Sequence, residues 1–288
     1  QGNITQGRKN GRTERLVSLV DGEAAHDEFA RDRGLAFGDG VFETLAWYDG
    51  RLLGWSRHME RLRLGCDTLG IPLPSDRVLY DECLAVARNL PRAVMKIIIT
   101  RGSGGRGYRP PSKPAPRRIV AAHPWPVHID SAETKTWICR QPVSINPSTA
   151  GIKHLNRLDQ VLASREWPGD NYFEGLMLDP SGFLIEGTRS NVFLVHDRTV
   201  VTPDLTQCGV KGIVRDAVMA SCRRDGIDLL EAPVRIETLI TAVEVFICNS
   251  IIGIRSVTSV HRPEEVRLQP GPVAERLSTS LRTEGVIV

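Results

Sequence analysis

A proline-rich segment in the middle of the chain, HPWPVHID at residues 123–130, most constrains what this sequence can fold into. Proline lacks the backbone donor that a helix interior or a central strand requires, and the segment shows little hydrophobic periodicity. Because a chain of 288 residues can bury more than one hydrophobic core, we expect a domain on each side of this segment. The expected division is a smaller α/β domain at 13–122, a linker at 123–130 and a larger domain at 131–288.

The first half alternates between strand-like and helical patterns. The Asp-Gly pair at 49–50 separates two apolar runs and indicates a hairpin. A helix is expected from Ser56, as its N-cap, to Gly70, because apolar residues recur there at helical spacing. The other expected elements are strands at Leu16–Val20, Val94–Thr100 and Arg117–Ala122 and a helix at Asp76–Asn89.

The second half is richer in strands. One expected helix has Leu155, Leu158, Val161 and Leu162 as its apolar face, and two more lie at Gly212–Arg224 and Pro272–Arg282. The expected strands are Thr136–Gln141, Gly175–Asp179, Phe183–Glu186, Asn191–Val195, Thr199–Thr202, Asp228–Ala232 and Glu244–Cys248. These elements indicate an α+β chain whose second domain is rich in antiparallel strands.

Composition narrows the function classes. A net charge of +3 is too small to imply a nucleic-acid or membrane partner, and no apolar run approaches the ~20 residues of a bilayer span. The polar, basic start of the chain lacks the apolar core of a secretory signal, and residues 1–12 are expected to be a flexible extension. Six scattered cysteines without a CxxC motif indicate reduced thiols and a cytoplasmic protein. The histidines form no metal-binding motif.

Lysine is scarce, which draws attention to Lys153 in GIKHLNRLDQ. The chain has six lysines, at positions 9, 96, 113, 135, 153 and 211. A reactive lysine needs a lowered pKa, and the apolar neighbours of Lys153 beside an expected helix start are consistent with that. On spacing alone, a surface lysine at a helix start is the simpler interpretation.

Two further segments carry possible binding groups. Glu186 ends an apolar strand and precedes a polar turn, where its carboxylate either faces a pocket or is solvated. Gly212 begins a helix whose free N–H groups and dipole favour a phosphate, and Arg61 is a possible partner for the same anion. Glycine before a helix is common and Arg61 also fits an exposed helix face, so neither segment decides the function alone.

The segment TRGSGGRGY, residues 100–108, follows an apolar strand. Its glycines and arginines suit close approach to a ligand, and arginine suits bidentate binding of a carboxylate. Such a segment also contacts RNA non-specifically. A lysine, an acid after a strand, a glycine-led helix and an arginine are together the groups that pyridoxal phosphate requires.

Five segments, taken together, resemble the class IV pyridoxal-phosphate-dependent aminotransferases, the fold type IV enzymes. They are RGLAFGDGVFETL (33–45), HMERL (58–62), GIKHLNRLDQVL (151–162), EGTRSNVF (186–193) and GVKGIVR (209–215). The similarity extends over about residues 16–257. Within that family, ITRGSGGRGY and AGIKHLNRLDQVL are similar to the aminodeoxychorismate lyases.

The resemblance implies a small N-terminal α/β domain, a larger C-terminal pseudo-barrel domain and pyridoxal 5'-phosphate between them. It also implies a homodimer whose loops reach the neighbouring site. Lys153 would form the Schiff base and Glu186 would contact the ring nitrogen. The phosphate would be bound by Arg61, Gly212, Ile213 and Ser250.

The similarity to the lyases implies conversion of 4-amino-4-deoxychorismate to 4-aminobenzoate and pyruvate in folate biosynthesis. Lys153 would be the base and Thr44 a proton relay. The substrate would be bound by Arg101, Arg106, Tyr108 and Asn249. Two alternatives remain: an aminotransferase for branched-chain or D-amino acids that uses the same Lys153 and Glu186, and a non-catalytic RNA-binding protein that uses the Gly-Arg segment.

Overall fold

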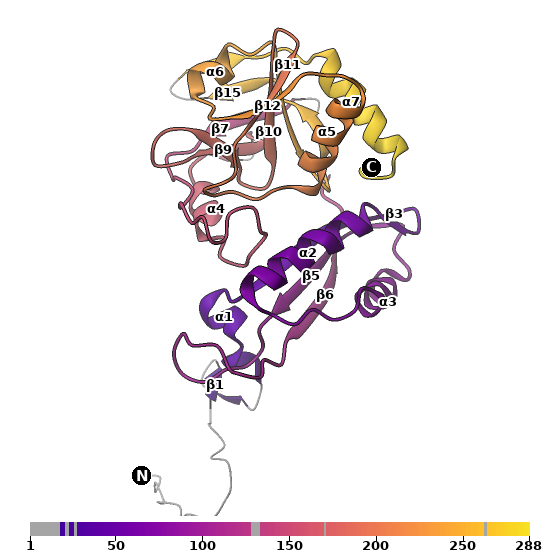
Figure 1. Cartoon of the computed structure of the whole chain (residues 1–288), viewed down its shortest axis with the longest axis vertical. Coiled ribbons are helices and arrows are strands. Elements are labelled where there is room, and N and C mark those ends of the chain that lie inside the picture. The colour runs from indigo at the N-terminus through magenta and orange to yellow at the C-terminus, as the bar shows by residue number, and fades with distance from the viewer. Residues whose placement is uncertain (1–17, 21–22, 26–27, 128–132, 170, 262–263) are drawn as a thin grey trace, which may run out of the picture.

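The structure, a computed structural model, describes residues 18–20, 23–25, 28–127, 133–169, 171–261 and 264–288. The predicted extension at 1–12 lies outside these residues, as do residues 128–130 of the predicted linker. Two lobes follow one another along the chain, a smaller one around β3, β5 and β6 and a larger one that contains two five-stranded sheets (Figure 1). The expected two-domain α+β organisation is therefore confirmed.

The small domain is an antiparallel sheet in the order β4-β3-β5-β6, with helices α2 and α3 packed on one face. Alternation along β3 places Val41, Glu43 and Leu45 on the helix face, where all three are buried, and turns Phe42 and Thr44 to the other face. The bounds are β1 (Ser18–Val20), β2 (Glu23–Ala25), η1 (Glu28–Arg31), α1 (Arg33–Phe37), β3 (Gly40–Tyr48), β4 (Arg51–Leu52), α2 (Trp55–Leu69), α3 (Asp76–Ala87), β5 (Arg92–Thr100) and β6 (Arg117–His123).

Helix α2 begins two residues earlier than a Ser56 N-cap would place it. Gly54 is the N-cap, and its φ of 61° is a left-handed conformation that favours glycine. Ser56 lies inside the first turn, so the prediction that it caps the helix is wrong. The end of the helix is as predicted, because Gly70 adopts the left-handed C-cap conformation with φ of 64°.

The large domain contains two sheets, in the orders β16-β15-β7-β8-β9 and β12-β11-β10-β13-β14. They meet where β9 contacts β10 and β11, and they enclose an apolar core that includes Leu176, Val192 and Ile247. This arrangement is the pseudo-barrel. The strand bounds are β7 (Lys135–Ile138), β8 (Glu174–Leu178), β9 (Leu184–Gly187), β10 (Asn191–His196), β11 (Thr199–Pro203), β12 (Leu229–Ala232), β13 (Glu244–Asn249), β14 (Gly253–Ser256), β15 (Ser259–His261) and β16 (Glu265–Arg267).

A second core lies on the outer face of the β10–β13 sheet. Phe193 and Phe246 stack there with their ring centroids 5.0 Å apart, covered by α5 and α7. The helices of this domain are α4 (Leu158–Ala163), α5 (Ile213–Arg224), α6 (Ile236–Ile240) and α7 (Pro272–Thr283). Along the described ranges, no helix combines the length and the apolar composition needed to cross a membrane.

Helix α4 is shorter than predicted, and it buries a different face from the predicted one. Leu158 and Val161 are 68% and 55% exposed, whereas Gln160 and Ala163 are buried. The prediction that Leu155, Leu158, Val161 and Leu162 form one core-facing stripe is wrong. The polar Gln160 faces inward because its Nε2 donates to Glu186 Oε1 at 3.4 Å, which leaves the apolar residues on the outside.

Candidate active site

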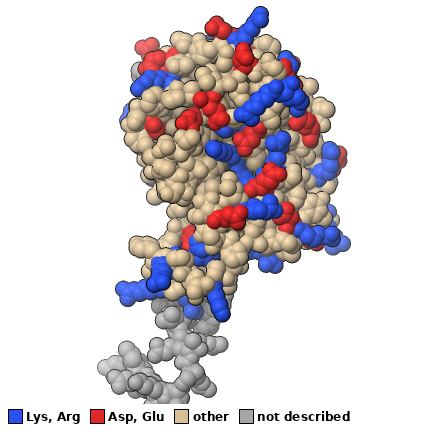
Figure 2. All heavy atoms as spheres, viewed as in Figure 1, with Lys and Arg blue, Asp and Glu red and all other residues tan. Residues whose placement is uncertain are grey.

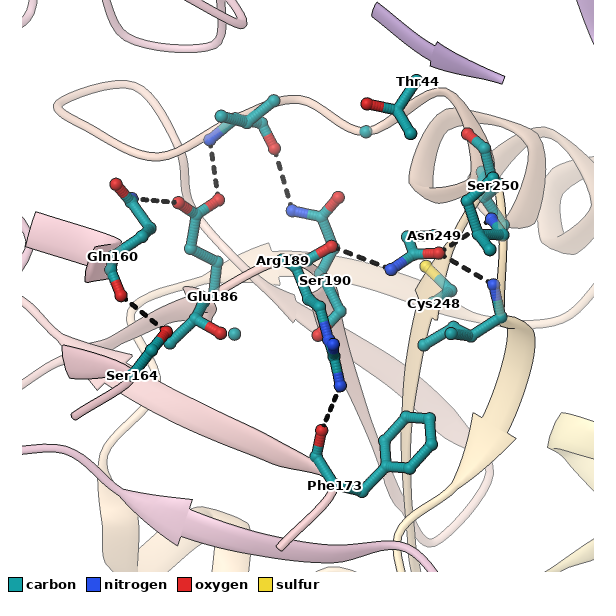
Figure 3. A pocket seen from close by; sticks show the side chains of 18 of the residues that line it. Thr44, Gln160, Ser164, Phe173, Glu186, Arg189, Ser190, Cys248, Asn249 and Ser250 are labelled. Atoms are coloured by element: carbon teal, nitrogen blue, oxygen red, sulfur yellow. Dashed lines mark hydrogen bonds between the residues drawn. The ribbon is translucent and has the colours of Figure 1, made fainter. Parts of the chain in front are cut away.

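A cavity of about 890 Å³ lies between the two domains and is lined by residues of both. This volume is that of a small-molecule or cofactor site, typically ~300–1,000 Å³. Eight residues singled out from the sequence line it: Thr44, Arg61, Lys153, Glu186, Gly212, Ile213, Asn249 and Ser250. Figure 3 shows Glu186 and Gln160 on one side of the cavity and Asn249 and Ser250 on the other.

Lys153 lies in a loop of the large domain that hydrogen-bonds to β3 of the small domain. Its carbonyl accepts a bond from Phe42 N of β3 at 2.9 Å, and Gly151, with φ of 84°, pairs with Val210 beside the start of α5. The Lys153 Nζ lies 4.4 Å from the centroid of the Phe42 ring. Burial, together with the positive charge of Arg61, lowers the pKa of Lys153 to about 8. A sizeable fraction of this amine is therefore neutral near physiological pH.

Glu186 lies at the end of β9, opposite Met177 of β8, and is 4% exposed. Its Oε2 accepts a hydrogen bond from Val210 N at 2.8 Å, and the Gln160 amide donates to its Oε1. Burial raises the pKa of this carboxyl above its ordinary value, although these donors act in the opposite direction. A buried acid with one donor on each oxygen is held in a fixed orientation at the wall of the cavity.

The start of α5 forms a close-fitting anion cradle. Gly212 is its N-cap, so the first backbone N–H groups of the helix have no partner within the helix. A Cβ at Gly212 would lie 2.1 Å from Asn191 Oδ1, and the Asn191 amide in turn donates to Val210 O at 2.8 Å. A larger residue there would require the Asn191 side chain or the helix start to shift. The Arg61 Nη1 donates to Lys211 O at 3.2 Å, which places the guanidinium beside the same helix start.

An ionic cluster behind Arg61 was not foreseen from the sequence. Glu43, on the helix face of β3, accepts bonds from His58 Nδ1 at 2.6 Å and from Arg61 Nε and Nη2 at 2.7 and 2.6 Å. Burial alone would raise the pKa of Glu43, but the Arg61 charge and the His58 ring bring it down to about 2. An acid among the core-facing positions of an apolar strand was the signal that could have found it.

The loop residues predicted to bind substrate do not lie in this cavity. Arg101 is 7% exposed, and its guanidinium donates to both Asp39 oxygens and to the carbonyls of Leu69 and Gly70. These donors are engaged within the small domain, and the role of Arg101 in substrate binding stays a prediction. Arg106 and Tyr108 do not line the cavity of their own chain, and Tyr108 is 84% exposed.

Two arginines that the sequence did not single out line the cavity instead. The Nε of Arg157 donates to His154 O at 2.9 Å, and within the described ranges its guanidinium makes no salt bridge, although the charges of Glu186 and Asp159 act on it from nearby. Burial lowers its pKa. Arg189, at the rim, donates to Phe173 O and is visible beside Ser190 in Figure 3.

These features define a cofactor-dependent enzyme site, because a half-buried amine with a lowered pKa, a buried carboxylate and a helix start with free N–H groups surround one cavity. The family model for amino-transferase class IV matches residues 40–260, and the chain belongs to that family. It is 33% identical over 256 residues to the aminodeoxychorismate lyase of Vibrio harveyi, over 88% of this chain and 94% of that protein.

Solved structures give the same result for the fold. The 4-amino-4-deoxychorismate lyase of Pseudomonas aeruginosa is 42% identical with a TM-score of 0.81, over 89% of this chain and 95% of that one. The branched-chain amino acid aminotransferase of Escherichia coli is 27% identical with a TM-score of 0.78, over 90% of this chain and 89% of that one. The cofactor of this family, and of this chain, is pyridoxal 5'-phosphate. The donor set of the cavity fits it: Lys153 suits its aldehyde, Glu186 its ring nitrogen and the α5 cradle its phosphate.

Proposed function

We propose that this protein is a lyase that converts 4-amino-4-deoxychorismate to 4-aminobenzoate and pyruvate, a step of folate biosynthesis. The observation that carries the proposal is the 42% identity to the solved Pseudomonas aeruginosa lyase, against 27% to the solved Escherichia coli branched-chain aminotransferase. In the sequence comparison the lyase, at 33%, differs little from the branched-chain aminotransferases, at 32% and 30%. The cavity supports it, because Thr44 and Lys153 both face the space where a substrate bound to the cofactor would lie.

The chain's own residues would hold the cofactor in one orientation. Lys153 would attach it covalently, and Glu186 would hold the proton of its ring nitrogen. The N–H groups of Gly212 and Ile213, the hydroxyl of Ser250 and the end of the Arg61 guanidinium would bind its phosphate. When bound, the cofactor supplies an electron sink for the carbon next to the substrate nitrogen.

Two proton transfers would then complete the reaction. The Lys153 amine, released when the substrate amine takes its place, would remove the proton from the ring carbon that bears the nitrogen. Its lowered pKa makes a larger fraction of it unprotonated for that step than for an ordinary lysine. The bond from the neighbouring ring carbon to the ether oxygen breaks, the ring becomes aromatic, and enolpyruvate leaves. Thr44, which projects from β3 into the cavity, would relay a proton to the leaving group, which becomes pyruvate.

The two carboxylates of this substrate need cationic partners. We propose Arg157 and Arg189 for them, because both line the cavity and Arg157 makes no ion pair in the described ranges. Asn249 also lines the cavity, but its amide donates to Arg189 O and its Oδ1 accepts from Ile251 N and Ile252 N. Asn249 therefore shapes the wall near Arg189 in addition to any contact with substrate.

We further propose that the working unit is a homodimer in which Arg106 and Tyr108 reach the neighbouring cavity. Large apolar side chains are exposed in the single chain on α1, on the Gly-Arg loop and on α4: Leu35 at 77%, Tyr108 at 84% and Leu158 at 68%. α1 and α4 lie near each other, because the Asn156 amide just before α4 donates to Gly38 O at the end of α1. Exposed apolar area of this kind favours association with a second copy. The cytoplasmic location stays a prediction, in keeping with six cysteines that are all buried and form no disulfide.

The decisive experiment adds 4-amino-4-deoxychorismate to the purified protein and follows 4-aminobenzoate by its fluorescence and pyruvate by a coupled assay. The proposal requires equal amounts of both products without an added amino acceptor. An aminotransferase would instead convert the bound cofactor to its amino form on addition of a branched-chain or D-amino acid. That spectral change, together with no 4-aminobenzoate, would contradict the lyase proposal.

The RNA-binding alternative receives little support. On the face drawn in Figure 2, basic and acidic side chains are interspersed and do not form one basic surface. Several arginines are paired with acids, including Arg101 with Asp39 and Arg118 with Glu82. Salt-sensitive RNA binding by a protein without a bound chromophore would favour this alternative.

A further inference from the structure

A charged side chain occupies a core position of β3 where an apolar one would be expected. Glu43 alternates with Val41 and Leu45 on the face that packs against α2, and its side chain is 1% exposed. A buried ion pair is seldom worth more than a well-packed apolar replacement, since both charges must leave water. Stability of the small-domain core therefore does not account for this acid, and the groups it contacts suggest what does.

The contacts of Glu43 fix the orientation of one guanidinium. Its two oxygens bind the Nε and Nη2 edge of Arg61, and the second oxygen is also fixed by the buried ring of His58. A guanidinium has five N–H groups in one plane. Glu43 takes two of them and Lys211 O takes one on Nη1, which leaves one N–H on each of Nη1 and Nη2. The bond from Nη1 to Lys211 O places this end of the guanidinium beside the start of α5.

We infer that Glu43 is the positioning residue that holds Arg61 for the phosphate of the cofactor. The end of an arginine fork is suited to a bidentate bond with a phosphate, but an arginine side chain is flexible and loses that geometry when unsupported. The two bonds from Glu43 orient the fork from β3, and the bond to Lys211 O orients it from the cradle. This inference rests on the proposed placement of the phosphate at Arg61 and Gly212.

The sign of the effect separates positioning from simple electrostatics. A carboxylate near a phosphate repels it, so removal of the Glu43 charge alone would strengthen phosphate binding. Loss of the Arg61 orientation would weaken it. The variant Glu43→Gln keeps the shape of the side chain and removes the charge, so weaker binding of the phosphate in this variant can only come through Arg61.

The test compares pyridoxal 5'-phosphate with pyridoxal, which has the same ring and aldehyde and no phosphate. The cofactor is first removed from the protein. Dissociation constants are then measured by absorbance for wild type, Glu43→Gln, Arg61→Met and the double variant. Loss of charge-assisted bonds predicts about 10-fold weaker binding of pyridoxal 5'-phosphate in Glu43→Gln and less than about 2-fold for pyridoxal. The double variant should bind no more weakly than Arg61→Met, because both substitutions remove the same interaction.

A matched control is Glu244→Gln. Glu244 is also buried, but it accepts bonds from Val273 N and Ala274 N at the start of α7, away from the cavity. Glu244→Gln should lower the free energy of unfolding without changing the ratio of the affinities for pyridoxal 5'-phosphate and pyridoxal. If Glu43→Gln does not fold, Glu43→Asp takes its place, because it keeps the charge but withdraws the carboxylate from Arg61, and the same phosphate-specific loss is expected.

The outcomes are distinct. Unchanged or tighter binding of pyridoxal 5'-phosphate in Glu43→Gln, or equal loss of both ligands, would overturn the role of Glu43 while Arg61→Met still shows the phosphate-specific loss. If Arg61→Met itself leaves the ratio unchanged, the phosphate does not lie at Arg61. The proposed cofactor placement then fails first, and the inference fails with it.

Discussion

In the proposed site the Lys153 amine must be neutral to attach the cofactor, and its surroundings set the pH at which it becomes neutral. Burial lowers the pKa of Lys153 to about 8, so its neutral fraction rises as the pH increases through that value. We expect the rate at which the cofactor-free protein binds the cofactor covalently to rise with pH and to reach half of its maximum near pH 8. Arg61→Met removes a positive charge and should move the profile to higher pH. Rapid-mixing absorbance measures both, and a rate that is flat across this pH range would contradict the assignment.

We also expect turnover to require the Lys153 amine. Lys153→Ala removes the proposed base as well as the covalent attachment, and loss of a general base alone lowers the rate by about 10²–10⁴-fold. Borohydride reduction followed by peptide mapping should locate the cofactor on Lys153 in the wild type and find no labelled lysine in the variant. Lys113→Ala, at an exposed loop position, is the matched control and should keep full turnover.

Glu43 makes a separate, pH-dependent contribution to stability. Its pKa is lowered from 4.5 to about 2 in the folded protein, so the unfolded chain binds this proton more readily. The stabilisation is complete above the ordinary pKa and is lost as the pH falls toward 2. Glu43→Gln should cost roughly 3–5 kcal/mol at neutral pH, and the difference from wild type should shrink in acid. Urea unfolding at a series of pH values measures it, and a constant difference would show that Glu43 is not ionised in the fold.

At the scale of elements, the sequence predicted regular segments well and short or polar ones poorly. The long periodic runs that became α2, α3, α5 and α7 and the apolar strands β5, β10 and β13 were all found. The strands β14, β15 and β16 were missed, because three or four residues carry too little alternation to distinguish a strand from a loop. Helix α4 was assigned the wrong buried face, since periodicity shows that a stripe is apolar but not what covers it.

The residues of the candidate site also divide into those that the sequence could predict and those that it could not. Lys153, Glu186 and Gly212 could be found because each lies in a distinctive segment next to an element boundary. Arg157 and Glu43 could not, because their roles depend on which residues of the other strand, helix or domain come to face them. Arg101 shows the converse: its segment suggested a ligand, but Asp39 and two carbonyls at the end of α2 use its donors.

The start of α5 gives the prediction that belongs to an element. In Gly212→Ala the new Cβ would lie 2.1 Å from Asn191 Oδ1, so either the helix start shifts or the Asn191 side chain moves and loses its bond to Val210 O. We expect a loss of about 1–3 kcal/mol in unfolding free energy, as for other overpacked sites, together with weaker binding of the cofactor. Gly226→Ala, beyond the other end of α5, is the control: its φ of 66° is strained for alanine, but its Cβ meets open space. It should cost about 1 kcal/mol and leave cofactor binding unchanged. Equal effects on binding would remove the cradle from the site.

At the scale of the whole molecule, the single chain leaves unexplained why its Gly-Arg loop carries an exposed aromatic. Tyr108 is 84% exposed and lies against the ring of Phe37, with centroids 5.3 Å apart, while Arg33 Nη1 and Nη2 bind the carbonyls of Gly107 and Tyr108. The loop is thus anchored to α1 but presents its tip outward. A tip held in this way and directed away from its own cavity is suited to complete the cavity of a second copy.

Subunit exchange tests this arrangement directly. Tyr108→Ala and Lys153→Ala should each lower turnover, the first through the partner's cavity and the second through its own. In a hybrid dimer one cavity receives both intact residues, so an equal mixture after free exchange should recover about a quarter of the wild-type sites. A mixture of Lys153→Ala with Glu186→Ala is the control, because both substitutions damage the cavity of their own chain and no hybrid site is intact. Recovery in neither mixture, with Tyr108→Ala inactive alone, would place Tyr108 at its own cavity; full activity of Tyr108→Ala would exclude it from the site.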